Sequence, residues 1–155
     1  MRIALFPSRK KQPAIDTAKL IAGHLQSRKA EVFSEEELAG QIGAKPLVST
    51  MLDRLDFMIS VGGDGTILRL LHKYPAMTAP ILGINMGSLG FMADVPRDDI
   101  LPSIDDLLKG SFSIDRRLML DVSANGKSHF AANDVVLHRS ENHSLIEMAV
   151  YVNNF

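Results

Sequence analysis

Short apolar runs alternate with amphipathic stretches through the first part of the chain. The runs have the length and the aliphatic content of buried parallel strands. They are Ile3–Phe6, Glu31–Phe33, Phe57–Val61 and Ile81–Asn85. Between and after these runs, apolar residues recur every three or four positions, which predicts helices beginning near Pro13, Ser34, Thr66 and Asp98. This alternation predicts an α/β fold, a parallel sheet with flanking helices of the Rossmann-like kind.

Local signals set the expected ends of these helices. Ser34 and Glu37 have the spacing of a capping box, which predicts a helix start at Ser34. Gly43 and Gly110 follow the last apolar positions of the second and fourth helices, where glycine commonly ends a helix.

The pattern changes to a period of two after Gly110. Apolar and polar residues alternate over Leu118–Ser123, and Asn125-Gly126 is a strong signal for a hairpin turn. We expect Phe130–His138 to return as the partner strand and Leu145–Asn153 to form a third strand. With no helix between them, these strands should be antiparallel. The change of pattern therefore predicts a domain boundary near residues 110–116, with an α/β domain over residues 1–112 and the start of an antiparallel, β-rich domain over residues 113–155.

A glycine turn, Gly62-Gly63-Asp64-Gly65, joins the third predicted strand to the third predicted helix. Residues without a Cβ let a ligand approach the backbone closely, and the first amides of a helix attract anions. A carboxylate is unexpected in a turn that only holds an anion. Asp64 therefore indicates a base acting on a hydroxyl group, or a metal ligand.

A plainer interpretation of this turn stays open. Glycine and aspartate both tolerate positive φ, and aspartate can cap a helix, so the segment could be a tight turn alone. It is not a Walker A loop, because it has no lysine, and it lacks the G-x-G-x-x-G spacing of dinucleotide-binding turns. The spacing indicates a phosphate-bearing ligand and no particular one.

Two further segments are expected at the same edge of the sheet. Met86–Phe91 is a second glycine-bearing turn, and Phe91 fits either the core or the apolar wall of a nucleotide pocket. The basic loop Arg9–Lys11 follows the first strand, where ligands gather in open α/β sheets, although each of its cations taken singly also fits a solvated loop.

Asn133 and Asp134 stand within the predicted partner strand. A buried pair of this kind is costly unless both side chains have partners. It therefore predicts either an internal cap or bulge, or contacts with a polar ligand in a cleft. His129, His138 and His143 are too scattered for a metal site by spacing.

Composition narrows the class of protein. The 155 residues suffice for an ordinary domain, and 46% are hydrophobic, so the chain can build a core. A formal net charge of −1 gives no electrostatic argument for nucleic acid or an anionic membrane as partner. The absence of cysteine excludes disulfides and thiolate metal sites and favours a cytoplasmic protein. No apolar run approaches the ~20 residues of a membrane span.

Three segments, in this order, resemble the NAD kinase family: Gly62-Gly-Asp-Gly-Thr66, Asn85-Met-Gly-Ser-Leu-Gly-Phe91 and Asn133-Asp-Val-Val-Leu-His138. The resemblance runs from Met1 to Phe155. The first segment alone is shared with diacylglycerol and sphingosine kinases, and the other two make the resemblance specific.

The resemblance implies phosphorylation of the adenosine-ribose 2′-hydroxyl of NAD to give NADP. ATP or inorganic polyphosphate is then the phosphoryl donor, Mg²⁺ or another divalent cation takes part, and the protein is a homo-oligomer. Asp64 is implied to accept the hydroxyl proton, with Gly65 beside it in the nucleotide site. The resemblance assigns no metal ligand, and it implies further substrate contacts at Arg69, Phe91, Asn133, Asp134 and Ser144.

The family continues beyond the point where this sequence stops. Its β-rich second half carries another Gly-Asp-Gly region and a Thr-Pro-Thr-Gly-Ser-Thr-Ala-Tyr segment, and neither occurs here. We therefore expect the first part of a kinase, with weak or no activity alone. Two rivals remain at this point: a kinase of lipids or other alcohols, which would ignore NAD, and a non-catalytic nucleotide-binding module, which would bind without turnover.

Overall fold

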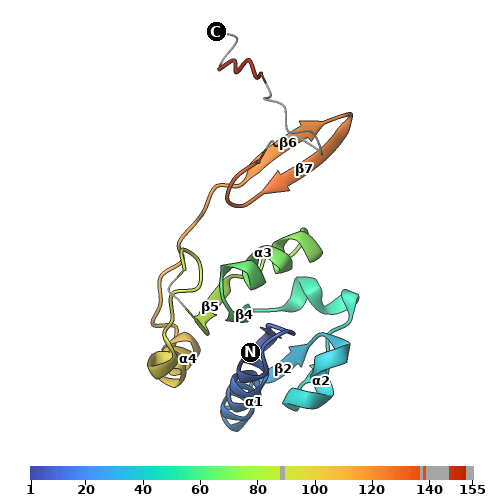
Figure 1. The fold of residues 1–155 in the computed structure, drawn as a ribbon. Helices are drawn as coiled ribbons and strands as arrows, with labels where there is room; N and C mark the ends of the chain where they lie inside the picture. The colour runs from blue at the N-terminus through green and yellow to red at the C-terminus, as the bar shows by residue number, and fades with distance from the viewer. Residues whose placement is uncertain (88–89, 137, 139–146, 153–155) are drawn as a thin grey trace. The chain divides into compact units, whose positions relative to one another are not determined.

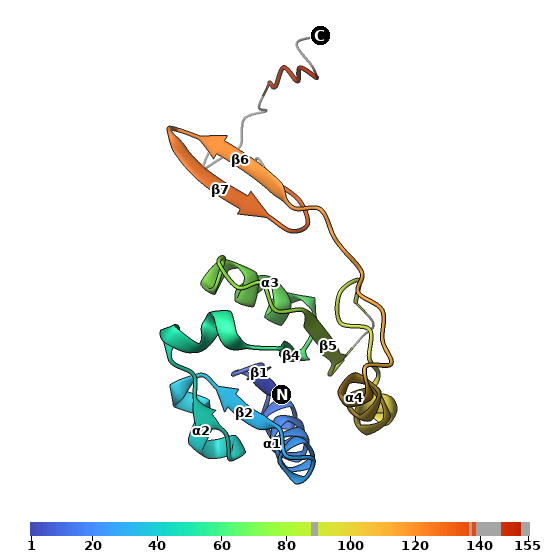
Figure 2. The same ribbon diagram turned by 180° about the vertical axis from the view of Figure 1, so that it is seen from behind.

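The computed structural model describes residues 1–87, 90–136, 138 and 147–152 (Figures 1 and 2). The chain divides into two units, Met1–Arg116 and Arg117–Phe155, and each is described here by itself. The first unit is a five-stranded parallel sheet with flanking helices, and the second contains a two-stranded antiparallel sheet. The predicted fold class is confirmed.

The first unit alternates strands and helices as the apolar pattern predicts. Its elements are β1 (Arg2–Pro7), α1 (Gln12–Ser27), β2 (Glu31–Ser34), α2 (Glu36–Ile42), β3 (Lys45–Pro46), the 3₁₀ helix η1 (Ser49–Arg54), β4 (Phe57–Gly62), α3 (Asp64–Lys73), β5 (Ile81–Asn85), the 3₁₀ helix η2 (Arg97–Asp99) and α4 (Ile100–Lys109). The apolar pattern predicts neither β3 nor η1. β3 has only two residues, both exposed, so it carries no apolar pattern to detect. No helix in the described part of the chain is long and apolar enough to cross a membrane.

The strand order of the sheet is β3-β2-β1-β4-β5, with every pairing parallel. From β1 the chain moves outward to β2 and β3, then returns to the other side of β1 as β4 and β5. The strand order therefore reverses between β1 and β4. Open α/β sheets bind ligands at such a reversal, outside the carboxyl ends of the strands.

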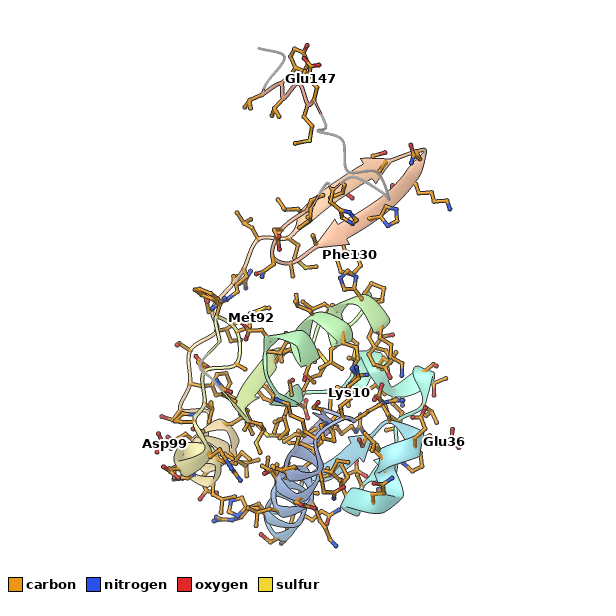
Figure 3. The ribbon with its side chains drawn as sticks, in the orientation of Figure 1. Lys10, Glu36, Met92, Asp99, Phe130 and Glu147 are labelled. Carbon is orange, nitrogen blue, oxygen red and sulfur yellow. The ribbon has the colours of Figure 1, made fainter. Side chains whose placement is uncertain are left out.

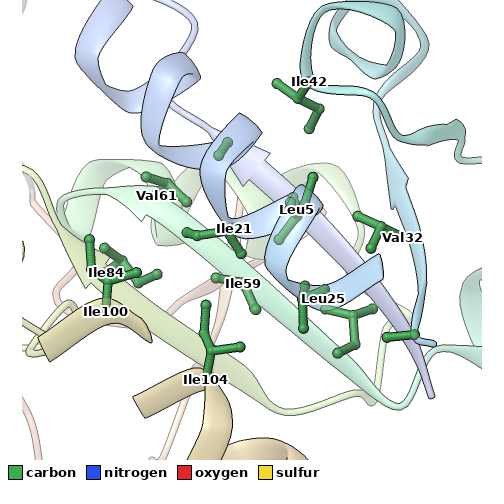
Figure 4. Packing of buried hydrophobic residues seen from close by; sticks show 14 of the residues in the cluster. Leu5, Ile21, Leu25, Val32, Ile42, Ile59, Val61, Ile84, Ile100 and Ile104 are labelled. Carbon is green, nitrogen blue, oxygen red and sulfur yellow. The ribbon is translucent and has the colours of Figure 1, made fainter. Parts of the chain in front are cut away.

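Two apolar layers cover the two faces of the sheet. Alternate residues of each strand point to opposite faces, so Ile3 and Leu5 join one layer while Ala4 and Phe6 join the other. The first layer contains the buried residues of α1 and α4, and Figure 4 shows part of it. The second layer contains Leu70 of α3. The loop after β1 thus leads to one face and the loop after β4 to the other, which opens the edge between them.

Glycine ends two helices where expected. Gly43 after α2 and Gly110 after α4 both have the left-handed conformation, with φ of 73° and 77°. The predicted capping box at Ser34 is wrong. The Ser34 hydroxyl instead donates a 2.7 Å hydrogen bond to the Leu5 carbonyl oxygen, and Glu35 occupies the N-cap position. A buried serine between two strands satisfies its hydroxyl on the neighbouring strand rather than on a helix end.

The second unit contains the predicted hairpin, with strand bounds that differ from the predicted ones. β6 (Leu120–Ala124) pairs antiparallel with β7 (Lys127–Ala131), and the two turn residues Asn125 and Gly126 have φ of 51° and 71°. A two-residue turn of this type makes Ala124 face Lys127, so the returning strand starts at Lys127, not at Phe130. β7 ends at Ala131, and the prediction that Asn133 and Asp134 lie within a strand is wrong.

The predicted third strand is wrong where the structure describes it. Residues 147–152 contain no strand, and Leu145, Ile146 and Asn153 lie outside the described residues. Met148, Val150 and Val152 are exposed. The alternation of apolar and polar residues fits a strand, but a strand also needs a neighbouring strand for its backbone hydrogen bonds, and this pattern does not provide one.

Candidate functional site

The candidate site lies at the carboxyl edge of β1, β4 and β5, where three loops begin. Two backbone hydrogen bonds tie the loops after β1 and β5 to the last residues of β4. The Ser8 amide donates to the Val61 carbonyl oxygen over 2.8 Å, and the Met86 amide donates to the Gly62 carbonyl oxygen over 2.6 Å. The edge around the strand-order reversal is therefore held together by main chain as well as by the sheet.

The glycine turn after β4 is packed tightly at its first residue. A Cβ added at Gly62 would overlap the Thr66 hydroxyl and would lie 3.3 Å from the Ser8 Cβ. Gly63 and Gly65, in contrast, have open space where a Cβ would be. Gly62 is thus required by packing. The openness at Gly63 and Gly65 leaves the backbone accessible to a ligand.

Asp64 is the first residue of α3, two residues before the predicted start at Thr66. Its carboxylate accepts hydrogen bonds from three successive backbone amides of the loop after β5: Phe91 at 2.7 Å, Met92 at 3.0 Å and Ala93 at 2.9 Å. The side chain therefore joins the turn after β4 to the loop after β5. It does not cap its own helix, because Gly63 holds that position.

The loop that donates these amides is itself fixed against β5. The Asn85 amide donates to the Val95 carbonyl oxygen, and the Val95 amide donates to the Gly83 carbonyl oxygen. Gly83 has no room for a side chain, because a Cβ there would lie 2.5 Å from the Met92 carbonyl oxygen and 2.7 Å from the Ala93 Cα. The position of the Asp64 carboxylate thus depends on how closely this loop packs on β5.

A cluster of charged side chains that the sequence pattern does not predict lies on the α3 side. Glu35, with a side chain only 1% exposed, accepts hydrogen bonds from Arg9, Arg69 and Lys73. The shortest are 2.8 Å from Arg9 Nη2 and 2.5 Å from Lys73 Nζ. Three cations from the loop after β1 and from α3 thus meet one carboxylate after β2. The acidic run Glu35–Glu37 is its sequence signal, but acidic residues at this position also fit the start of a helix.

This environment shifts the titration of the cluster. Burial raises the pKa of Glu35, but hydrogen bonds from Lys73 and Arg9 and the charge of Arg69 outweigh it and lower the pKa from 4.5 to about 2. The hydrogen bond to Glu35 raises the pKa of Lys73. Glu35 is therefore ionised throughout the neutral range.

The first unit matches a known protein family over most of its length. The family described as "ATP-NAD kinase N-terminal domain" matches residues 4–112. That match covers the parallel sheet from Ala4 onward, its helices and the loop contacts of Asp64.

The chain belongs to the ATP-NAD kinase family.

Relatives in this family include the NAD kinase of Protochlamydia amoebophila, 48% identical over 97% of this chain and 54% of the relative. The NAD kinase of Laribacter hongkongensis is 33% identical over 99% of this chain and 56% of the relative. The chain spans about half the length of these curated NAD kinases.

Two solved structures of the NAD kinase group resemble this one. An NAD kinase from Archaeoglobus fulgidus in complex with ATP has a TM-score of 0.52 and 28% identity, over 71% of this chain and 38% of that chain. Yeast NADH kinase complexed with NADH has a TM-score of 0.70 over 84% of this chain and 46% of that chain. Its 16% identity makes it a likeness of fold alone.

The structure distributes the residues implied by the NAD kinase resemblance between the two units. Asp64, Gly65, Arg69 and Phe91 belong to the first unit, where Phe91 is 84% exposed and so is not a core residue. Asn133 and Asp134 belong to the second unit, are exposed and lie outside its strands. Ser144 lies outside the described residues.

Arg69 is turned toward Glu35. Its Nη1 donates to both carboxylate oxygens, at 3.2 and 3.3 Å. Its Nη2 is buried and has no acceptor in the described part of the chain. Arg69 is thus an anchor of α3 that keeps one donor group unused.

The described residues contain no group of three or more histidine, aspartate or glutamate side chains that could hold a metal ion. This composition does not suit a metal held by protein ligands alone.

Proposed function

We propose that this chain carries the base and part of the nucleotide site of an NAD kinase. The reaction transfers a phosphoryl group from ATP, or from polyphosphate, to the 2′-hydroxyl of the adenosine ribose of NAD. Family membership and the position of Asp64 support this proposal. Asp64 stands at the edge where the strand order reverses, at the start of a helix and beside open glycines.

In this proposal the 2′-hydroxyl oxygen attacks the terminal phosphorus of the donor. A new O–P bond forms while the bond from that phosphorus to the bridging oxygen breaks, and ADP or a shortened polyphosphate leaves. The hydroxyl proton passes to the Asp64 carboxylate and then to solvent. Phosphoryl transfer asks for positioning and charge neutralisation more than for covalent help, and one placed carboxylate meets the need for a base.

The three amides on Asp64 constrain how the substrate reaches it. A carboxylate offers about four lone-pair positions. The ribose hydroxyl therefore either joins the amides of Phe91, Met92 and Ala93 on the carboxylate or displaces one of them. In both cases these amides orient the carboxylate, and the loop after β5 responds to substrate.

Other residues complete the proposal. Gly65 lets the nucleotide approach the backbone, and Phe91 offers an exposed ring for a base or ribose to pack on. Arg69 would contact the dinucleotide. The second unit would form the start of the substrate domain and bring Asn133, Asp134 and Ser144 to the ligand. A divalent cation would arrive with the phosphates, where it neutralises their charge, and the assembled enzyme would be a homo-oligomer.

Binding tests the proposal on the chain as it exists. Calorimetric titration should detect NAD and ATP, and residues 90–93 should shift in NMR spectra when NAD is added, because the hydroxyl reaches the Asp64 carboxylate. Sphingosine in mixed micelles serves as the comparison ligand. Binding of the lipid alcohol with no response to NAD would contradict the proposal and favour the lipid-kinase class.

The three hydrogen bonds between the Asp64 carboxylate and the loop after β5 favour a second candidate function, that of a non-catalytic nucleotide-binding unit. In that case the carboxylate only closes the loop after β5. NAD would still bind, but the amide signals of residues 91–93 would not respond to the ribose hydroxyl. Titration with 2′-deoxy-NAD separates the two candidates, since only a base role makes the loop response depend on the hydroxyl.

A further inference from the structure

We infer that Lys10 and Lys11 bind the condensed phosphate chain of a nucleotide at the carboxyl edge of the sheet. The inference rests on the proposed function, which makes a nucleotide the source of that chain. It assigns phosphate binding to residues outside the glycine turn. The inference can therefore be wrong even if the chain binds NAD and ATP as proposed.

The loop that carries both lysines lies at the reversal of strand order. It runs from the end of β1 to the start of α1, and the Ser8 amide ties it to Val61 at the end of β4. The Lys11 side chain reaches past β4 toward the turn after β5: a Cβ added at Gly87 would lie 3.8 Å from Lys11 Nζ. Lys11 therefore lies across the carboxyl ends of the adjacent strands β1, β4 and β5. Figure 3 labels its neighbour Lys10.

The ion pairs of this region separate the lysines from the other cations. Arg9 of the same loop and Arg69 and Lys73 of α3 all contact Glu35, and Arg9 also contacts Glu37. Lys10 and Lys11 pair with no carboxylate among the residues the structure describes. Both are exposed at the surface. Their ammonium groups thus remain available to an anion, while the three neighbouring cations are engaged by Glu35 and Glu37.

The chemistry of the site requires such charges. A di- or triphosphate chain carries several negative charges, and the Gly62–Gly65 turn supplies a carboxylate rather than a lysine. A lysine ammonium serves a phosphate chain as a point charge with three rotatable donors. Lys11 is also the N-cap of α1, so it stands at the positive end of the helix dipole. No acidic residue in the first turn of α1 offsets this positive potential.

The test compares glutamine variants by calorimetry. Lys10→Gln, Lys11→Gln and the double variant are titrated with tripolyphosphate, which has the phosphate chain and neither base nor ribose. Lys19→Gln is the matched control, an exposed lysine of α1. We expect the double variant to lose about tenfold in affinity and to depend less on salt, with Lys19→Gln unchanged. Lys11→Arg should restore most of the affinity of the single variant.

Parallel titrations identify the source of the phosphates. Weaker ATP binding with unchanged NAD binding assigns the lysines to the donor, and the reverse pattern assigns them to the pyrophosphate of the dinucleotide. Both patterns support the inference. Affinities for tripolyphosphate, ATP and NAD that all stay within twofold of the unmodified chain overturn it and leave the proposed function intact. A chain that binds neither nucleotide overturns the proposed function as well.

Discussion

At the scale of single residues, the carboxylates of Asp64 and Glu35 have different partners and different structural roles in the first unit. The Asp64 carboxylate is satisfied by main-chain amides at the ligand edge, while the Glu35 carboxylate is satisfied by three cationic side chains. One keeps the loop after β5 in place and the other joins α3 to β1 and β2. Replacing each carboxylate by its amide, as in Asp64→Asn and Glu35→Gln, keeps the shape of the side chain and removes its charge.

Asp64→Asn should loosen the loop after β5 as well as remove the proposed base. Of the two asparagine side-chain atoms only the oxygen accepts hydrogen bonds, so a backbone amide now held by one carboxylate oxygen would face an NH₂ group. We expect a loss of about 1–3 kcal/mol in the free energy of unfolding and faster amide hydrogen exchange at residues 91–93. Asp94→Asn, at an exposed neighbour, is the control. Unchanged exchange in the Asp64 variant would mean that these hydrogen bonds do not hold the loop.

Glu35→Gln should remove a pH-dependent part of the stability. The folded pKa of about 2 lies below the ordinary 4.5, so ionised Glu35 stabilises the fold above pH 4.5, and this stabilisation is lost as the pH falls toward 2. We expect the variant to be about 3 kcal/mol less stable at pH 7, since it removes the carboxylate that pairs with Arg69 and Lys73 and one of the two that pair with Arg9.

The difference between the Glu35→Gln variant and the unmodified chain should shrink as urea denaturation is repeated from pH 5 to pH 2. Glu36→Gln, an exposed neighbour at the start of α2, should change stability by about 0.5 kcal/mol or less at any of these pH values. A deficit in Glu35→Gln that stays constant with pH would contradict the ionic role of this carboxylate.

The sequence identified the chemistry of single residues better than their partners. Asp64 was singled out because a carboxylate is unusual in a glycine turn, but no local pattern indicates that amides 27 to 29 positions later hold it. Arg69 was predicted to contact NAD, and its contact with Glu35 depends on a packing of α3 against the β2 end that spacing alone does not give. Long-range partners of polar groups follow from tertiary packing.

At the scale of elements, β5 and the loop that follows it form the support of the site. Gly83→Ala should displace this loop, because the new methyl group would meet the Met92 carbonyl oxygen and the Ala93 Cα, both of them backbone atoms. We expect a loss of about 1–3 kcal/mol in stability, with NMR shifts at residues 91–93. Gly23→Ala in α1 has open space around the new Cβ and should stabilise the chain slightly. A Gly83 variant as stable as the Gly23 variant would contradict the close packing of this loop.

Element types followed from apolar periodicity, and their limits depended on local geometry. The stripe Ala18, Ile21, Ala22 and Leu25 is completely buried, as α1 requires. Ser34 misled the prediction because its hydroxyl is needed inside the sheet. In the hairpin, the turn type rather than the apolar pattern decided the register, so the strand started at Lys127 and ended before Asn133.

At the scale of the whole molecule, the buried core of the described residues lies in the first unit. All the buried residues of both apolar clusters precede Gly110. We therefore expect a fragment of residues 1–116 to unfold cooperatively in urea, within about 1 kcal/mol of the full chain. The full chain measured under the same conditions is the reference. A fragment without a cooperative transition would show that the second unit contributes to the core of the first.

The central claim is that Asp64 of this chain acts as the base that activates the ribose hydroxyl of NAD. The most direct measurement is NADP formation by a hybrid in which residues 1–155 replace the matching part of the Protochlamydia amoebophila NAD kinase, which is 48% identical. Gly83→Ala in the hybrid controls for loop displacement, since it keeps the carboxylate. We predict that Asp64→Asn lowers kcat by about a hundredfold or more while the affinity for NAD changes little. A hybrid that turns over NAD with kcat within threefold after Asp64→Asn would contradict the claim.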